Sequence, residues 1–124
     1  MKVKVSELTG AALDWVVAVC KNLEIHPPQK DMKIAVRNVE WEPWWVFTPS
    51  TNWAQGGPIL EREGISISSP RPEEDDRDWQ ARALSVSSFM SREYKKGDTP
   101  LEAAMRCYVT SKLGDEVEIP EELL

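Results

Sequence analysis

The stretch DTPLEAAMRCYVTSKLG, residues 98–114, carries the strongest structural pattern in the sequence. Thr99 is a favourable N-cap, Pro100 suits the first helical position, and Glu102 completes a capping box. The stretch ends at Gly114, which can supply a left-handed cap. Apolar residues recur along it at helical spacing, at Leu101, Ala104, Met105, Tyr108, Val109 and Leu113. The pattern predicts a capped helix with one apolar face.

A second helix is predicted near the other end of the chain, over residues 9–22. Its apolar stripe is formed by Leu13, Val16, Val17 and Cys20. Trp15 lies about a quarter turn from this stripe and is expected to flank the core. The two helices are expected to pack together, and the two cysteines, Cys20 and Cys107, are expected to be buried free thiols.

Alternating apolar and polar residues predict short strands within residues 1–5, 33–41, 44–48, 65–68 and 79–88. Residues 49–58 show no period and are interpreted as a loop, and residues 92–98 as a turn. Residues 59–61 fit either a short extended piece or one turn of helix. Two helices and several strands in mixed order predict an α+β fold, with a small antiparallel sheet and both helices packed on one of its faces.

The length of 124 residues fits a single domain, residues 1–124. A mobile surface loop is expected at residues 70–78 and an acidic C-terminal tail at residues 115–124. The net charge of −6 disfavours non-specific nucleic-acid binding. Neither a signal-like segment nor an apolar run of membrane-spanning length is found in the sequence, which predicts a soluble, cytoplasmic protein and no membrane partner.

Residues of the kinds that carry catalysis are scarce in this sequence. The single histidine, His26, lies beside two prolines and is interpreted as an exposed loop residue. The sequence contains no zinc-ligand set and no phosphate-binding glycine motif, so no catalytic residue, metal site or cofactor is predicted. Glu61 and Glu63 would project from one face of a strand and could act as an acid and a base, although a solvated edge is the simpler interpretation.

Aromatic and polar residues are concentrated in the middle of the chain. Six tryptophans are present, three of them within ten positions. Such a mixture is typical of small-molecule pockets, in which a ring stacks on the ligand and amides bind its polar edges. The predicted ligand-binding residues are Trp44, Trp45, Thr48, Ser50, Thr51, Asn52, Trp53, Gln55, Gly56, Gly57 and Arg62.

Several of these residues have an expected role. Trp53 would stack on the ligand, while Asn52 and Gln55 would bind its polar edges. The amides of Gly56 and Gly57 would face an anionic group, and Arg62 would add charge. Adjacent Trp44 and Trp45 would face opposite sides of a strand. Two alternatives remain open: Trp53 anchors the loop in the core with its polar neighbours capping turns, or the tryptophans form a protein interface.

Three blocks of the sequence resemble the NinX-like family of lambdoid phages and prophages. They are MKVKVSELTGAALDWVVAVC, PSTNWAQGGPILEREGI and TPLEAAMRCYVTSKLGDEVEIPEELL, and together they cover about half of the chain. The family's usual central block is close to PSTDWAQGGPIIERE, so this chain has Asn52 in place of an aspartate. That difference disfavours acid–base chemistry at position 52, whereas an amide still suits binding. The resemblance implies an accessory phage protein and no particular activity.

The interpretation that we favour at this stage is a non-catalytic protein that binds a nucleotide-like small molecule and could sequester a host defence signal. The missing catalytic residues and the polar segment around Trp53 support it. A first alternative is an interaction module that binds a host protein through exposed tryptophans and an acidic surface. A second alternative is a hydrolase that uses Glu61 or Glu63. Assembly into a homo-oligomer is also considered, because a shared pocket would explain the surplus of tryptophan.

Overall fold

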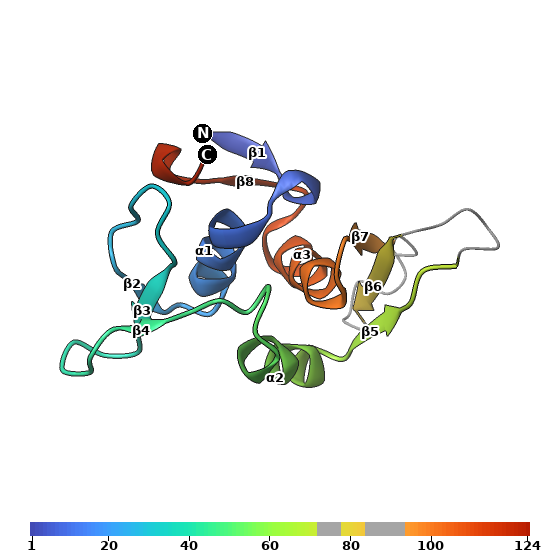
Figure 1. Ribbon diagram of the computed structural model, residues 1–124, viewed down its shortest axis with the longest axis horizontal. Helices are drawn as coiled ribbons and strands as arrows, with labels where there is room; N and C mark the ends of the chain where they lie inside the picture. Colours follow the sequence, from blue (N-terminus) through green and yellow to red (C-terminus); the bar gives the residue numbers. More distant parts are fainter. Residues whose placement is uncertain (72–77, 84–93) are drawn as a thin grey trace.

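The computed structural model describes residues 1–71, 78–83 and 94–124 of the chain. These residues form three α-helices, α1 (Gly10–Cys20), α2 (Trp53–Glu63) and α3 (Pro100–Leu113). Helix α3 lies in the middle of the molecule, with α1 on one side and α2 below it in Figure 1. The predicted packing between the two terminal helices is confirmed, since α1 contacts α3 directly.

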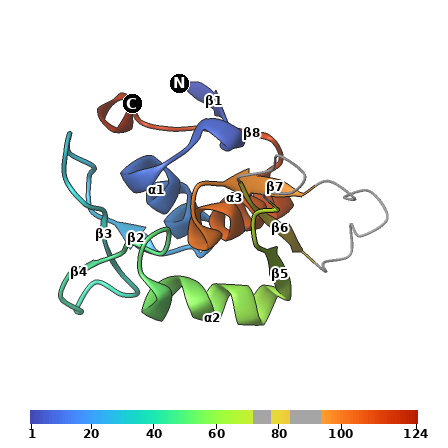
Figure 2. The same ribbon diagram turned by 45° about the vertical axis from the view of Figure 1, so that its right-hand side comes forward.

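The strands pair in three small antiparallel sheets. The first contains β1 (Lys2–Lys4) and β8 (Glu116–Glu118). The second contains β2 (Glu24–Ile25), β3 (Ala35–Arg37) and β4 (Trp45–Val46), and the third contains β5 (Ile65–Ser68), β6 (Trp79–Ala83) and β7 (Lys95–Gly97). The predicted α+β class is therefore confirmed. The strands are too short and too far apart to form the one expected sheet, and they surround the helices instead (Figures 1 and 2).

Helix α3 has buried residues beyond the single apolar face that was predicted for it. Its buried residues are Leu101, Ala103, Ala104, Met105, Cys107, Tyr108 and Val109. They pack against the third sheet, α1 and α2. Leu113, which was expected to extend the apolar face, is 46% exposed because it lies at the free end of the helix. The helix is thus the central element around which the other elements pack.

The start of α3 follows the predicted capping pattern closely. The Glu102 N–H donates to the Thr99 hydroxyl over 3.1 Å. The Glu102 carboxylate, in turn, accepts from the Asp98 N–H over 3.2 Å, one residue before the N-cap. Gly114 ends the helix with φ 89° and ψ −168°, which is not the predicted left-handed helical conformation, although the positive φ still suits glycine. The agreement at the start explains why the helix could be predicted from local sequence.

Helix α2 was not predicted, and the interpretation of residues 49–58 as a loop is wrong from Trp53 onward. The sequence here contains Gly56, Gly57 and Pro58, which are all unfavourable inside a helix. Pro58 lies at the sixth helical position and cannot donate a backbone hydrogen bond there. Packing compensates for the poor local preference, because Ile59 is fully buried and the helix rests on α3.

Several other predictions fall near or outside the described residues. Most of the expected loop at residues 70–78 lies outside them, as does the second half of the strand expected within residues 79–88. Residues 95–97 were interpreted as part of a turn, but they form strand β7 because they pair with β6. The segment 115–124, expected as a tail, forms β8 and a 3₁₀ turn, η4 (Glu121–Leu123).

Both cysteines are free thiols, with Cys107 buried and Cys20 partly buried. Burial raises the pKa of the Cys20 thiol to about 11. None of the helices in the described ranges 1–71, 78–83 and 94–124 has the length and apolar character that crossing a bilayer requires.

Candidate functional site

The predicted binding residues Asn52 and Gln55 make hydrogen bonds inside the fold. The Asn52 side-chain oxygen accepts from the Ala54 N–H over 2.9 Å, so it is the N-cap of α2. The Gln55 amide bridges the outer edge of β4. It donates to the Val46 carbonyl over 2.8 Å and accepts from the Thr48 N–H over 2.7 Å. These bonds fasten the first turn of α2 to the second sheet and cover its edge strand.

The two glycines of this segment have different surroundings. A Cβ added to Gly56 would lie 2.5 Å from the Pro49 carbonyl oxygen and 2.7 Å from a methyl group of Leu101. A Cβ added to Gly57 would meet no described atom within 4 Å. Gly56 therefore permits the close approach of α2 to the chain before it and to α3. The groups that approach Gly56 closely are thus a backbone carbonyl and a side chain of the protein, whereas the sequence had predicted a ligand there.

The tryptophans lie in separate surroundings. Trp53 is the first residue of α2 and is 55% exposed, so it does not anchor a loop in the core. Trp44 packs against the Arg37 guanidinium, 4.1 Å from its ring centre, and edge-on against His26. Trp45 packs edge-on against Phe47. The adjacent tryptophans thus have different partners. Because Trp44 lies just before β4, their expected orientation on opposite sides of one strand stays a prediction.

Arg62 and its two flanking glutamates lie near the end of α2, away from these rings in sequence. Glu63 forms an ion pair with Lys112 of α3 over 2.9 Å. Because the segment is helical, residues two apart do not share a face. The condition under which Glu61 and Glu63 could act together, a strand with both on one face, is therefore not met.

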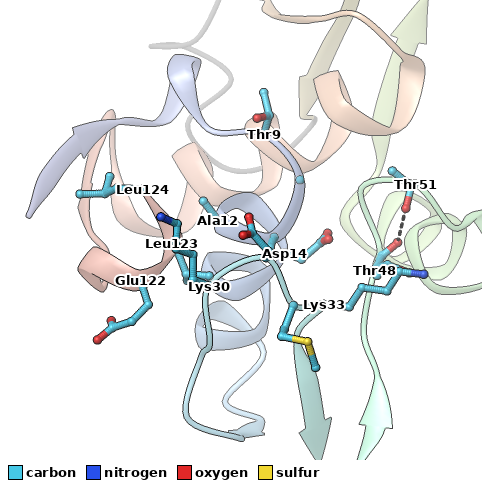
Figure 3. A pocket seen from close by; sticks show the side chains of 14 residues that line it. Thr9, Ala12, Asp14, Lys30, Lys33, Thr48, Thr51, Glu122, Leu123 and Leu124 are labelled. Carbon is cyan, nitrogen blue, oxygen red and sulfur yellow. Dashed lines mark hydrogen bonds between the residues drawn. The ribbon is translucent and has the colours of Figure 1, made fainter.

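A hollow of about 460 Å³ brings together residues from four parts of the chain. We call it the α1 hollow; it is lined by residues 9–12, Asp14, residues 30–33, Thr48, Thr51 and residues 122–124. Figure 3 shows these side chains around the start of α1, with Thr48 and Thr51 on one side and the C-terminal residues on the other. Of the eleven predicted binding residues, Thr48 and Thr51 line this hollow.

The start of α1 faces the α1 hollow without a side-chain cap. The Thr9 hydroxyl makes no capping hydrogen bond, and the first-turn amides of residues 10–12 have no hydrogen-bond partner within the described parts of the chain. Free amides and the helix dipole together favour an anion at such a position. Lys30 and Lys33 line the same hollow, and neither forms an ion pair with a described residue.

Asp14 is a buried carboxylate in the wall of the α1 hollow, only 3% exposed. It accepts a hydrogen bond from the Ser50 N–H over 2.9 Å. Burial raises the pKa of Asp14 from its ordinary value of 3.8 to about 6, and the bond from the Ser50 N–H opposes part of that rise. The Ser50 hydroxyl oxygen is itself buried and lacks a hydrogen bond to any described residue.

Asp14, Lys30 and Lys33 were not among the residues predicted from the sequence. Asp14 carried a signal, because it is a charged residue inside the apolar stretch AALDWVVAV of a predicted helix. The two lysines lie in a loop without a motif. Only the fold places them beside the start of α1.

Comparison with known proteins identifies the family. The model of the family Bacteriophage P22, NinX matches residues 4–112, which is most of the chain. The chain belongs to this NinX family. The resemblance inferred from the three sequence blocks is therefore confirmed. No curated protein matches the sequence.

The structure also bears on position 52, where the resemblance implies an aspartate in other members. Asparagine and aspartate are both strong N-cap residues. Either side chain can accept the bond from the Ala54 N–H at the start of α2. The central block of that resemblance coincides with the residues that fasten α2 to the rest of the fold.

Proposed function

We propose that this NinX-family protein binds a small nucleotide-like anion in the α1 hollow, without catalysis. The observation that carries the proposal is the uncapped start of α1, which faces a space also lined by Lys30 and Lys33. An anionic group would accept hydrogen bonds from the free amides and interact with both lysines. Three carboxylates, Asp14, Asp31 and Glu122, line the same hollow, so the lysines and the free amides mark the part of it in which the anionic group would lie.

The rest of the α1 hollow suits the less charged part of such a ligand. Its volume of about 460 Å³ falls in the usual range of small-molecule sites. Met32, Leu123 and Leu124 offer apolar surface for a flat ring, and the hydroxyls of Thr48 and Thr51 lie on the other side. The Asp14 carboxylate can accept hydrogen bonds from the N–H groups of a base. The ring, the polar edge and the anionic group of the ligand would each contact suitable residues of the α1 hollow.

Binding can be tested by isothermal titration calorimetry against mono-, di- and cyclic nucleotides, at pH 7 and low salt. Exchanging both Lys30 and Lys33 for glutamine should weaken binding at least about tenfold, because two charge contacts are lost. Trp53→Ala is the matched control, because Trp53 does not line the α1 hollow. The proposal fails if no nucleotide binds at millimolar concentration, or if Trp53→Ala abolishes binding while the lysine variant retains it.

A non-catalytic role can be tested on the same samples. Phosphorus NMR of a bound nucleotide should show the unchanged ligand after prolonged incubation and after its release by denaturation. Sequestration of a host signal is the physiological role that such intact retention would support. Conversion of the ligand would show catalysis, and a Glu61→Gln, Glu63→Gln double variant would then test the hydrolase alternative.

A further inference from the structure

The most exposed tryptophan lies at the tip of an ordered loop. Residues 38–44, here called the Trp41 loop, connect β3 to β4, and the Trp41 side chain is 85% exposed. The Glu42 N–H donates to the Val39 carbonyl over 3.1 Å. The Glu42 carboxylate accepts from the Asn38 N–H, also over 3.1 Å. An indole held out by an internally bonded loop loses little conformational freedom when it binds a partner.

Two glutamates, Glu40 and Glu42, flank Trp41 in the sequence. An apolar ring between two carboxylates fits a cavity that has cationic side chains at its rim, because ammonium groups attract both carboxylates and the face of an indole. The same pairing already occurs within the chain, where Arg37 packs on Trp44 and pairs with Glu24.

The chain itself contains a cavity of this kind. A hollow of about 400 Å³, here called the β7 hollow, lies between the start of the chain, β7 and α3. Its wall includes Val5 and Tyr94 as apolar surface and the cations Lys4, Lys95 and Lys96. Its volume is within the range of cavities that hold small molecules and so admits an indole.

Several cations of the β7 hollow have carboxylate partners in the same chain. Lys95 pairs with Asp115 over 3.3 Å, and Arg106 pairs with Glu102 over 3.0 Å. Lys4 lies opposite Glu116 in the β1–β8 pair. Lys96 is the exposed cation for which no described carboxylate is a partner. The rim therefore keeps a positive excess that complements the Trp41 loop.

The segment between β3 and β4, which is the Trp41 loop, and strand β7, which lines the β7 hollow, lie on opposite sides of the molecule in both views (Figures 1 and 2). The loop cannot reach the hollow of its own chain. We propose that the Trp41 loop of one copy inserts into the β7 hollow of a second copy, in a head-to-tail contact. A heterologous contact of this type does not stop at a two-fold dimer and leads to a ring or an open chain. The contact is small, which makes the assembly weak and dependent on concentration.

Sedimentation equilibrium from about 10 µM to about 1 mM tests this inference. The weight-average mass should rise with concentration from the 14.1 kDa of a single chain. Trp41→Ala should hold the mass at one chain over the whole range. Trp53→Ala, which alters another exposed tryptophan, should leave the wild-type association unchanged.

A charge exchange distinguishes the proposed contact from other associations. Glu40→Lys should weaken self-association, as should Lys96→Glu, because each variant brings like charges together. An equimolar mixture of the two variants should associate again, because each loop then meets a hollow of opposite charge. Glu42 is left unchanged because it closes the loop, and Lys4 because it faces Glu116. Circular dichroism confirms that each variant is folded.

The proposal is overturned if the wild type remains a single chain at about 1 mM, a concentration at which weak contacts of this size are populated. It is also overturned if Trp41→Ala associates like the wild type, or if the mixture of charge variants does not regain mass. Nucleotide binding in the α1 hollow is a separate property, so either proposal can fail alone.

Discussion

Helices α2 and α1 begin in contrasting ways. The start of α2 is capped by Asn52 and fastened to the edge of β4 by Gln55. The start of α1 has no side-chain cap among the described residues and faces a hollow lined by two lysines. The most prominent polar side chains of the sequence lie at the start of α2, and they already form hydrogen bonds within the fold. The free backbone amides lie at the start of α1, which has no such polar segment.

This difference separates polar residues that stabilise the structure from polar residues available to a ligand. Composition alone does not distinguish the two, since amides, hydroxyls and glycines serve both purposes. What distinguishes them is whether each donor and acceptor already has a partner. By that criterion the segment from Asn52 to Gly56 is part of the framework. Thr48 and Thr51, on its edge, still reach the α1 hollow.

The largest expected effect comes from the close contact that Gly56 permits. Gly56→Ala should lower the free energy of unfolding by about 3 kcal/mol, because the new methyl group would clash with the Pro49 carbonyl and Leu101. Urea denaturation followed by circular dichroism measures this change. The result would show that α2 is held by packing at its first turn.

Gly57→Ala is the matched control for this measurement. Its methyl group would meet no described atom within 4 Å, and alanine favours a helix over glycine by up to about 1 kcal/mol. This variant should be as stable as the wild type or more stable. Equal losses in the two variants would mean that α2 is not packed as described.

The next effect concerns pH and the wall of the α1 hollow. Asp14 has a pKa of about 6 in the folded chain and an ordinary value of 3.8 when exposed. The folded state therefore binds more protons between these values, and the free energy of unfolding falls as the pH rises through them. Between pH 5 and pH 7 this one group should lower stability by about 1.3 kcal/mol.

Asp14→Asn should remove that pH-dependent part, because an amide can still accept from the Ser50 N–H and does not titrate. The stability difference between the variant and the wild type should then change in favour of the variant as the pH rises from 5 to 7. Asp31→Asn is the control: Asp31 is exposed and has a φ of 63°, which asparagine also tolerates. If the stability difference between Asp14→Asn and the wild type does not change with pH, the Asp14 carboxyl is in contact with water in the folded chain.

The sequence predicted those elements whose local signals agree with their final packing. Helix α3 has its cap, its proline and its apolar face within one continuous stretch. Strand β5 was predicted at Ile65 to Ser68, where the structure has it. Helix α2 was missed because Gly56, Gly57 and Pro58 oppose a helix locally, and the buried contact of Ile59 overcomes them only in the folded chain.

The candidate site could be predicted only in part for a related reason. Thr48 and Thr51 were identified because they lie inside a conspicuous polar segment. Lys30, Lys33 and Asp14 come from a loop and from another helix, so no single stretch of sequence brings them together. The orientation of the open end of α1 toward those lysines depends on the whole fold. A local pattern does not contain that information.

The smallest effect tests the comparison between the two helix starts directly. Asn52→Ala should lower the free energy of unfolding by about 1 kcal/mol, because the Ala54 N–H loses its acceptor. Thr9→Ala should cost much less, since the Thr9 hydroxyl makes no capping bond to the first turn of α1 among the described residues. Denaturation of both variants under the same conditions measures the contrast. A loss at Thr9 equal to that at Asn52 would show that the threonine caps α1 in solution. A first-turn amide would then already have a partner, and an anion in the α1 hollow would depend more strongly on Lys30 and Lys33.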